Sequence, residues 1–259
     1  MPRFAANLTM LFNEVAFLDR FELAARAGFQ AVEFLFPYTH AAKDIRERLD
    51  ANGLRLVLHN MPPGDWDAGE RGIACLADRV DEFRTGVATA IRYAKVLGVE
   101  QLNCLAGKAP PSVPDAVLRQ TLVANLKFAA QACKQAGLRI LLEPINTFDI
   151  PGFYVTRTDQ ALSLLDEVGE DNAYLQYDID HAQRMEGELA ATITQHLHRI
   201  GHVQLADNPG RQEPGTGEIN FPFLFEHLDR VGYTGWVGCE YKPASSTAAG
   251  LGWVKNFLP

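Results

Sequence analysis

The chain has 259 residues, of which 47% are hydrophobic, so it can build a large core and is not a predominantly disordered protein. Its formal net charge of −8 at pH 7 argues against a protein that grips nucleic-acid phosphates. The four scattered cysteines, no visible signal peptide and no apolar run of the roughly 20 residues that span a bilayer predict a cytoplasmic protein without disulfides or membrane attachment.

A repeated order of β-rich run, helical segment and glycine extends along the chain. Seven glycines stand just after helical segments, where a left-handed residue ends a helix and turns the chain toward the next strand: Gly28, Gly53, Gly98, Gly137, Gly169, Gly201 and Gly232. A βα unit takes about 30 residues or more. Seven such caps after a first strand therefore predict eight strands.

The predicted strands are Phe4–Leu8, Ala31–Phe34, Leu54–His59, Gln101–Leu105, Arg139–Glu143, Ala173–Tyr177, His202–Leu205 and Trp236–Glu240. The predicted helices are Phe17–Ala27, Ala41–Asn52, Arg79–Leu97, Asp115–Ala136, Thr158–Val168, Glu186–Ile200 and Phe221–Val231. This alternation predicts an α/β fold, a single (β/α)8 TIM barrel that forms one domain over residues 1–259. An open doubly wound sheet is the alternative, but it usually carries a glycine-rich loop after its first strand, and residues 7–11 contain no glycine.

Two long connections, residues 60–72 after the third strand and 207–220 after the seventh, are polar and rich in glycine and proline. Both follow the C-terminal ends of strands, where barrel active sites lie. Arg71 and Arg211 on these loops are candidates for holding an anionic substrate, although each could equally be a solvated loop charge.

Polar side chains end four consecutive strands: Glu143, Asp178, Gln204 and Glu240. Such residues converge at the mouth of a barrel, and three crowded carboxylates would raise one another's pKa unless a divalent cation relieved the repulsion. The oxygen-rich set predicts a site for Mg²⁺ or Mn²⁺ rather than a structural zinc site. Taken singly, each acid could instead be a helix cap or an ion-pair partner, and Gln204 could simply form hydrogen bonds.

His181, three residues after Asp178, could be a metal ligand, a substrate contact or a hydrogen-bond partner, and we favour the substrate contact. His59 and Glu33, at the ends of the third and second strands, are expected to line the pocket. Four further histidines are expected on helices or at helix ends, without a catalytic role: His196, His198, His202 and His227.

From end to end, the chain resembles the xylose isomerase-like barrel superfamily. The resemblance rests on four segments at strand ends, 143–146 (EPIN), 177–181 (YDIDH), 202–207 (HVQLAD) and 238–241 (GCEY). Loop residues 62–66, 69–72 and 214–219 are most similar to the hydroxypyruvate isomerase family. The 2-oxo-tetronate isomerases, which also rearrange a small 2-oxo acid, are similar as well.

The resemblance implies that Glu143, Asp178, Gln204 and Glu240 bind the metal and that the two glutamates are an acid/base pair on opposite faces of the substrate. The wider family usually has histidine at the position of Gln204, and the substitution favours Mg²⁺ or Mn²⁺ over tightly bound zinc. In the implied reaction the metal holds two oxygens of hydroxypyruvate and stabilises an enediolate, while the glutamates move a proton from C3 to C2 to give tartronate semialdehyde (2-hydroxy-3-oxopropanoate). His181 would orient an oxygen, and Arg211 or Arg71 would hold the carboxylate.

Other functions fit the same pattern less well. A ketose 3-epimerase would use the same two acids on a longer, neutral sugar, whereas the loop arginines favour an acid. A DNA-repair enzyme like endonuclease IV needs three zinc ions and more histidines at strand ends, where this chain has Asn103, Cys104 and Gln204. A non-catalytic binding barrel would show no affinity for divalent ions. The expected partner is a small 2-oxo or hydroxy acid and neither nucleic acid nor a membrane, and a homo-oligomer is compatible with the sequence.

Overall fold

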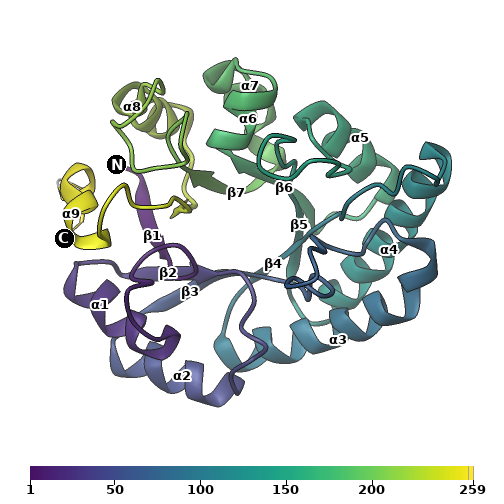
Figure 1. Cartoon of the computed structure of the whole chain (residues 1–259), viewed down its shortest axis with the longest axis horizontal. Helices are drawn as coiled ribbons and strands as arrows, with labels where there is room; N and C mark the ends of the chain where they lie inside the picture. The colour runs from purple at the N-terminus through teal and green to yellow at the C-terminus, as the bar shows by residue number, and fades with distance from the viewer. Residues whose placement is uncertain (256, 259) are drawn as a thin grey trace.

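Eight parallel strands close into a barrel in chain order, with the helices on its outer side (Figure 1). The computed structural model describes residues 1–255, 257 and 258. The strands are β1 (Arg3–Asn7), β2 (Ala31–Phe34), β3 (Arg55–Asn60), β4 (Gln101–Cys104), β5 (Arg139–Leu142), β6 (Ala173–Asp178), β7 (Ile200–Leu205) and β8 (Trp236–Cys239). All eight predicted strands are present, and each begins and ends within two residues of its predicted bounds, so the predicted TIM barrel is confirmed.

Most of the predicted helices are also present. They are α1 (Arg20–Arg26, after a 3-10 turn over Phe17–Asp19), α2 (Ala42–Ala51), α3 (Val80–Leu97), α4 (Asp115–Gln135), α5 (Thr158–Val168) and α8 (Phe221–Val231). Gly98, Gly169 and Gly232 follow α3, α5 and α8 with φ of 73°, 69° and 82°, the left-handed conformation predicted for these helix ends. No helix in the described part of the chain is both long and apolar enough to cross a bilayer.

The predicted helix Glu186–Ile200 is wrong in its bounds. The chain instead forms α6 (Ile179–Met185) directly after β6, turns, forms α7 (Leu189–His196) and a 3-10 turn, and enters β7 at Ile200. Asp178 starts α6 because its Oδ1 accepts the backbone N–H groups of Asp180 and His181 at 2.8 and 3.4 Å. Gly187, at φ 69°, separates α6 from α7.

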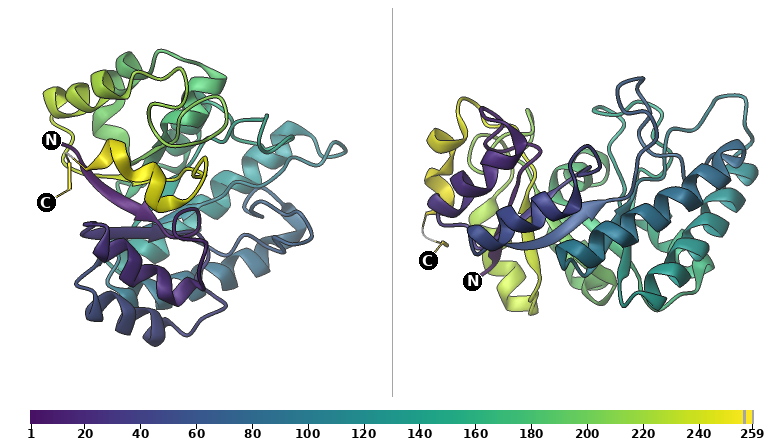
Figure 2. Two further views of the ribbon diagram at one scale, coloured as in Figure 1. Left: turned by 60° about the vertical axis from the view of Figure 1, so that its left-hand side comes forward. Right: turned by 90° about the horizontal axis from the view of Figure 1, so that it is seen from below.

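The last helical segments, α9 (Thr247–Gly250) and the 3-10 turn η4 (Leu251–Val254), were not predicted because each spans only four residues. They lie beside β1, where the chain began, in both views of Figure 2. The ring of Trp253 packs edge-on against Phe4 of β1, with centroids 5.2 Å apart. The segment 247–254 therefore covers the outer side of the strand with which the barrel begins.

Inside the barrel, an apolar layer that includes Ala5, Val57 and Leu141 is followed, toward the C-terminal ends of the strands, by a polar one. The fully buried carboxylate of Glu33 lies at its centre. Glu33 Oε1 accepts hydrogen bonds from Asn7 Nδ2 at 2.9 Å and from Gln204 Nε2 at 2.8 Å. A buried charge is costly unless it is paired and hydrogen-bonded, and here each donor comes from another strand.

His202 and Gly238 complete this polar layer. His202 Nε2 lies 2.6 Å from Glu33 Oε2, so its prediction as a helix-end residue is wrong. The error arose because its partner, Glu33, lies 169 positions away in the sequence. A Cβ atom at position 238 would lie 2.2 Å from Glu33 Oε2, so β8 must carry glycine there to leave room for the carboxylate.

Candidate active site

A cavity of about 400 Å³ opens at the C-terminal mouth of the barrel. Its walls include Glu143 after β5, Glu240 after β8, His181 on α6, and Arg71 and Arg211 from the two long loops. The volume lies in the range of small-molecule sites, roughly 300 to 1,000 Å³. Residues from distant parts of the sequence thus meet in one pocket at the end of the barrel where the polar strand ends were predicted to converge.

The loop over residues 207–220 is held in shape by a buried acid, Asp207. Its Oδ2 accepts the backbone N–H groups of Gly215 and Gly217 at 2.8 and 2.9 Å. A Cβ on Gly217 would lie 2.2 Å from the Asn208 carbonyl oxygen, so this approach requires glycine. The loop carries Arg211 inward, and the side chain is only 11% exposed although the loop is polar.

The Arg211 guanidinium lies among the carboxylates. Its Nη2 is 3.3 Å from Asp178 Oδ2 and 3.2 Å from Glu240 Oε2, and its Nη1 is 3.3 Å from Asp149 Oδ2. Burial opposes the charged form of Arg211, but the facing carboxylates, Asp178 first, outweigh it and raise its pKa. Arg211 is therefore a fixed positive charge of the site and not the solvated loop residue that was the alternative.

The two glutamates both have pKa values above the ordinary range of a carboxyl group. Burial, and then the charge of Asp178, raise the pKa of Glu143 to about 8. Burial raises the pKa of Glu240 well above its usual range, and Arg211 opposes that rise. Asn103 Nδ2 donates to Glu143 Oε2 at 2.7 Å, which fixes the orientation of this carboxyl. General acids and bases work best when their pKa is near the working pH.

His181 has a defined tautomer because Asn146 is itself oriented by the backbone. Asn146 Oδ1 accepts the N–H groups of Phe148 and Asp149 at 3.0 and 2.8 Å, so its amide nitrogen faces the imidazole. That nitrogen lies 2.7 Å from His181 Nδ1, which must accept. The ring proton is then on Nε2, 3.8 Å from Glu143 Oε1 and 3.7 Å from Asp178 Oδ2. Burial, and then the charge of Arg211, whose Nη1 lies 3.1 Å from Nε2, lower the pKa of His181 well below its usual range, so the ring is neutral.

The donor set of the site fits a divalent cation. Ligand atoms of Glu143, Asp178 and His181 lie within 4.8 Å of one another, and all three residues are buried. Both carboxylate oxygens of Asp180 are buried without a hydrogen-bond partner, and burial followed by the charge of Asp178 raises its pKa to about 7. One guanidinium does not balance these acids, so they hold protons or a cation. Carboxylate oxygen ligands suit Mg²⁺ or Mn²⁺.

Gln204, predicted as the fourth ligand, faces the polar layer below this cluster. Its Oε1 accepts from Gln176 Nε2 at 2.5 Å, while its Nε2 donates to Glu33 at 2.8 Å. Both ends of the amide are therefore engaged within the barrel, as in the alternative that Gln204 simply forms hydrogen bonds. Its role as a metal ligand stays a prediction. Because Oε1 already accepts one hydrogen bond, Gln204 would have to bind the metal through the second lone pair of that oxygen.

Two predicted substrate contacts lie less directly in the site. His59 is fully buried, its Nδ1 lies 3.1 Å from the carbonyl oxygen of Asn60, and Asn60 is the residue that reaches the cavity wall. Arg71 lines the cavity with its guanidinium 3.9 Å above the Trp66 ring, and it donates to the carbonyls of Trp66 and Glu70 at 2.9 and 2.6 Å. Glu33, also expected to line the pocket, lies in the polar layer beneath it.

Sequence reasoning missed several residues of the site. Asp149 and Asp180 form a second possible ligand group with His181, and Lys242 reaches the cavity wall from the segment after β8. Asp180 carried a signal, because it stands between Asp178 and His181 in the segment YDIDH. Lys242 carried a weaker one, two residues beyond the strand-end acid Glu240.

Comparisons with known proteins agree with this geometry. Residues 21–257 match the family model described as xylose isomerase-like TIM barrel. A hydroxypyruvate isomerase from Escherichia coli K12 is 55% identical over 99% of this chain and 100% of its own length. A 2-oxo-tetronate isomerase from Cupriavidus necator is 50% identical over 100% of this chain and 99% of its own. A crystal structure described as an AP endonuclease, family 2, from Brucella melitensis matches with a TM-score of 0.98 and 44% identity over 100% of both chains.

Proposed function

The chain belongs to the xylose isomerase-like TIM barrel family, in which its full-length curated relatives are isomerases, and from this premise we propose that it interconverts hydroxypyruvate and tartronate semialdehyde. The observation that carries the proposal is the pair of buried glutamates, Glu143 and Glu240, which line one cavity and whose pKa values are raised by burial, so that both can hold a proton. Arg211 contacts one of them and His181 lies beside the other.

The side chains divide the work of this reaction. One glutamate takes a proton from C3 of the substrate, and a glutamate returns one to C2. His181, with its proton on Nε2, donates to a substrate oxygen on which negative charge develops, and buried donors of this kind act most strongly where water is excluded. The carboxylates of Glu143 and Asp178, with Glu240 and Gln204 nearby, would hold a divalent cation, which supplies Lewis-acid stabilisation of the substrate oxygens.

The substrate carboxylate needs a cation that is not already paired, and we assign it to Lys242. Arg211 is engaged by Asp178 and Glu240, and Arg71 donates to two backbone carbonyls. Lys242 lines the same cavity and forms no ion pair with any residue in ranges 1–255 and 257–258. Its backbone is anchored, because its N–H donates to the Arg211 carbonyl at 2.7 Å.

Replacing Lys242 by Ala should therefore raise KM for hydroxypyruvate by roughly 10- to 100-fold, the loss of one hydrogen bond to a charged group of about 1.5 to 3 kcal/mol. The value of kcat should change little, because the carboxylate does not react. Steady-state kinetics would measure both, with Lys127→Ala as the matched control, since Lys127 is exposed on α4. An unchanged KM would show that Lys242 does not bind the substrate carboxylate.

An activity screen tests the proposed function itself. The purified protein with Mg²⁺ or Mn²⁺ is expected to act best on hydroxypyruvate, with 2-oxo-tetronate as the second candidate because a relative of that name is 50% identical over the full chain. Free ketoses should be poor substrates, since they lack the carboxylate that Lys242 would bind. Absence of turnover on both acids, together with cleavage of abasic DNA, would instead support the function for which the matching Brucella structure is named.

A further inference from the structure

A second cavity, of about 310 Å³, lies at the opposite, N-terminal mouth of the barrel, and we propose that it binds a small dianion, the phosphate group of a phosphorylated metabolite. We call this space the basal cavity. Its walls include Arg3, Arg55, Glu100, Arg139, Tyr233 and Trp236. The first residues of β1, β3, β5 and β8 are among them. The apolar layer that includes Ala5, Val57 and Leu141 separates it from the catalytic mouth.

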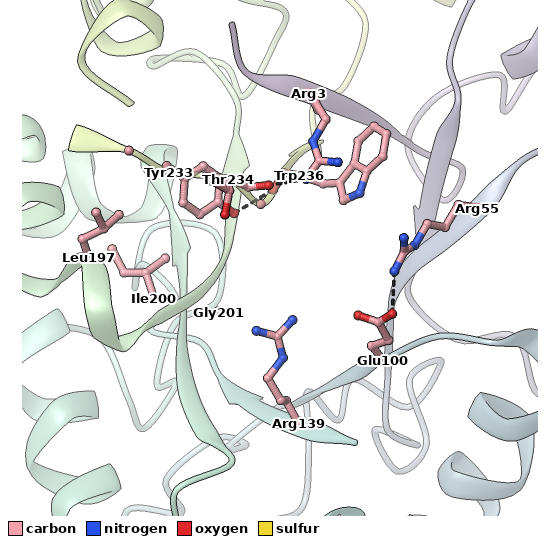
Figure 3. Close-up of a pocket in the computed structure, with 12 residues that line it drawn as sticks. Arg3, Arg55, Glu100, Arg139, Leu197, Ile200, Gly201, Tyr233, Thr234 and Trp236 are labelled. Carbon is pink, nitrogen blue, oxygen red and sulfur yellow. Dashed lines mark hydrogen bonds and ion pairs between the residues drawn. The ribbon is translucent and has the colours of Figure 1, made fainter. Parts of the chain in front are cut away.

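Three guanidinium groups are arranged around this space (Figure 3). Arg55 is paired, with its Nη2 2.6 Å from Glu100 Oε1. Arg3 donates to the Thr234 carbonyl and lies 4.7 Å above the Trp236 ring, and Arg139 lies 5.6 Å above the Tyr174 ring. Within the described part of the chain neither has a carboxylate partner. Three positive charges and one negative charge leave a net +2 in this cavity, although the chain as a whole carries −8.

The barrel geometry aims these side chains inward. Successive strand residues alternate between faces, so Arg3 shares a face with Ala5, and Arg139 with Leu141. In such barrels alternate strands contribute one layer, and Arg3, Arg55 and Arg139 come from β1, β3 and β5. The apolar layer above already closes the core, so folding does not require three arginines beneath it.

The fourth strand of that layer, β7, adds no charged residue to the cavity wall. β7 carries Gly201 there, and a Cβ atom at this position would lie 2.6 Å from Leu141 Cδ2. The β7 residues at the wall of the basal cavity are Ile200 and Gly201, so β7 supplies no acid that would neutralise it. The Tyr233 hydroxyl is tied to the backbone, since it donates to the Trp236 carbonyl at 2.8 Å and accepts from the Val203 N–H at 3.1 Å. The aromatic wall is thus rigid.

These features match a phosphate ester more closely than other anions. The planar guanidinium presents paired N–H groups that fit phosphate oxygens, and a phosphate monoester carries close to two negative charges at neutral pH. The volume accommodates a small organic group beyond the phosphate, against the Trp236 and Tyr233 rings.

Isothermal titration calorimetry with glycerol 3-phosphate, inorganic phosphate and malonate tests the proposal on the as-purified protein. We expect glycerol 3-phosphate to bind, with a Kd that rises with salt, and malonate to bind more weakly. Arg139→Ala and Arg3→Ala should each raise this Kd by roughly 10- to 100-fold, the loss of a charge-assisted hydrogen bond. The matched control, Arg26→Ala, removes an exposed arginine paired with Glu22 on α1 and should leave the Kd unchanged.

Binding at the catalytic mouth is separated from the basal cavity by Lys242→Ala, which should not alter the Kd for glycerol 3-phosphate. Circular dichroism and Tm identify a variant that fails to fold, and Arg139→Lys, which keeps the charge but loses the paired donors, is then used instead and should also weaken binding. The proposal is overturned if no heat of binding appears at millimolar phosphate ester, if binding survives both arginine substitutions, or if malonate binds as tightly.

Discussion

Replacing Glu143 or Glu240 by Gln is expected to lower kcat for hydroxypyruvate by about a hundred- to ten-thousand-fold, the usual contribution of a positioned acid or base. Glutamine keeps the shape of the side chain but cannot accept or return the substrate proton. The measurement is the rate of isomerisation at saturating substrate, with Glu226→Gln as control because Glu226 is exposed on α8. If either site variant turned over at a near-normal rate, the paired-acid mechanism would be wrong.

Exchange with solvent deuterium would assign the two roles. If Glu143 is the base at C3, the Glu240→Gln variant should still exchange the C3 hydrogens of hydroxypyruvate with D₂O, although it completes few isomerisations. The Glu143→Gln variant should then show neither exchange nor isomerisation. The reverse pattern would assign the base to Glu240. Proton NMR of the substrate pool measures the exchange separately from product formation.

Removal of divalent cations by EDTA is expected to abolish the activity, and re-addition of Mg²⁺ or Mn²⁺ to restore it. The affinity for the metal should also depend on pH, because a ligand carboxyl must lose its proton before it binds. With the Glu143 pKa near 8, this carboxyl is protonated at pH 6 in the absence of metal, so affinity should rise between pH 6 and 8. The rise should be up to about tenfold per pH unit for each proton released, since one pKa unit is about 1.36 kcal/mol.

Titration of EDTA-treated protein with Mn²⁺ at pH 6, 7 and 8 measures this linkage. The raised pKa of Glu143 also contributes to the pH dependence of the stability of the metal-free protein. Its folded value of about 8 lies above the ordinary 4.5, so the unfolded chain binds fewer protons between these values and stability falls as pH rises through that window. Saturating Mn²⁺ should remove this fall. Full activity in EDTA, or an affinity independent of pH, would contradict a metal at Glu143.

The strand order and the mouth of the barrel follow from local patterns in the sequence. Glycines after helices and polar residues at strand ends placed Glu143, Asp178 and Glu240 in adjacent units, and the structure brings them together around Arg211. The repeat in the sequence predicts this arrangement because each βα unit adds the next strand of the barrel, so that residues at the ends of consecutive strands become neighbours.

What the sequence did not predict depends on contacts across the barrel. The amide of Gln204 is directed by Gln176 and Glu33, neither of which lies near it in the chain. The helix α6 was not predicted because it begins at the first residue after β6, and no loop in the sequence separates the strand from the helix. The ion pairs of Arg211 could not be predicted, because they depend on the relative positions of Asp149, Asp178 and Glu240 in space. No spacing in the sequence indicates these positions.

The buried carboxylate of Glu33 connects the docking of the strands with the removal of water from the inside of the barrel. Glu33 receives one hydrogen bond from the neighbouring strand β1, and its other partners, Gln204 and His202, lie on β7, so its set of partners is complete only when β7 has docked. Until β7 has been synthesised and docked, Glu33 has no protein donor on that side and must keep its water. We therefore expect water to leave Glu33 only when β7 takes its place in the barrel, and a chain that ends before β7 to keep that carboxylate hydrated.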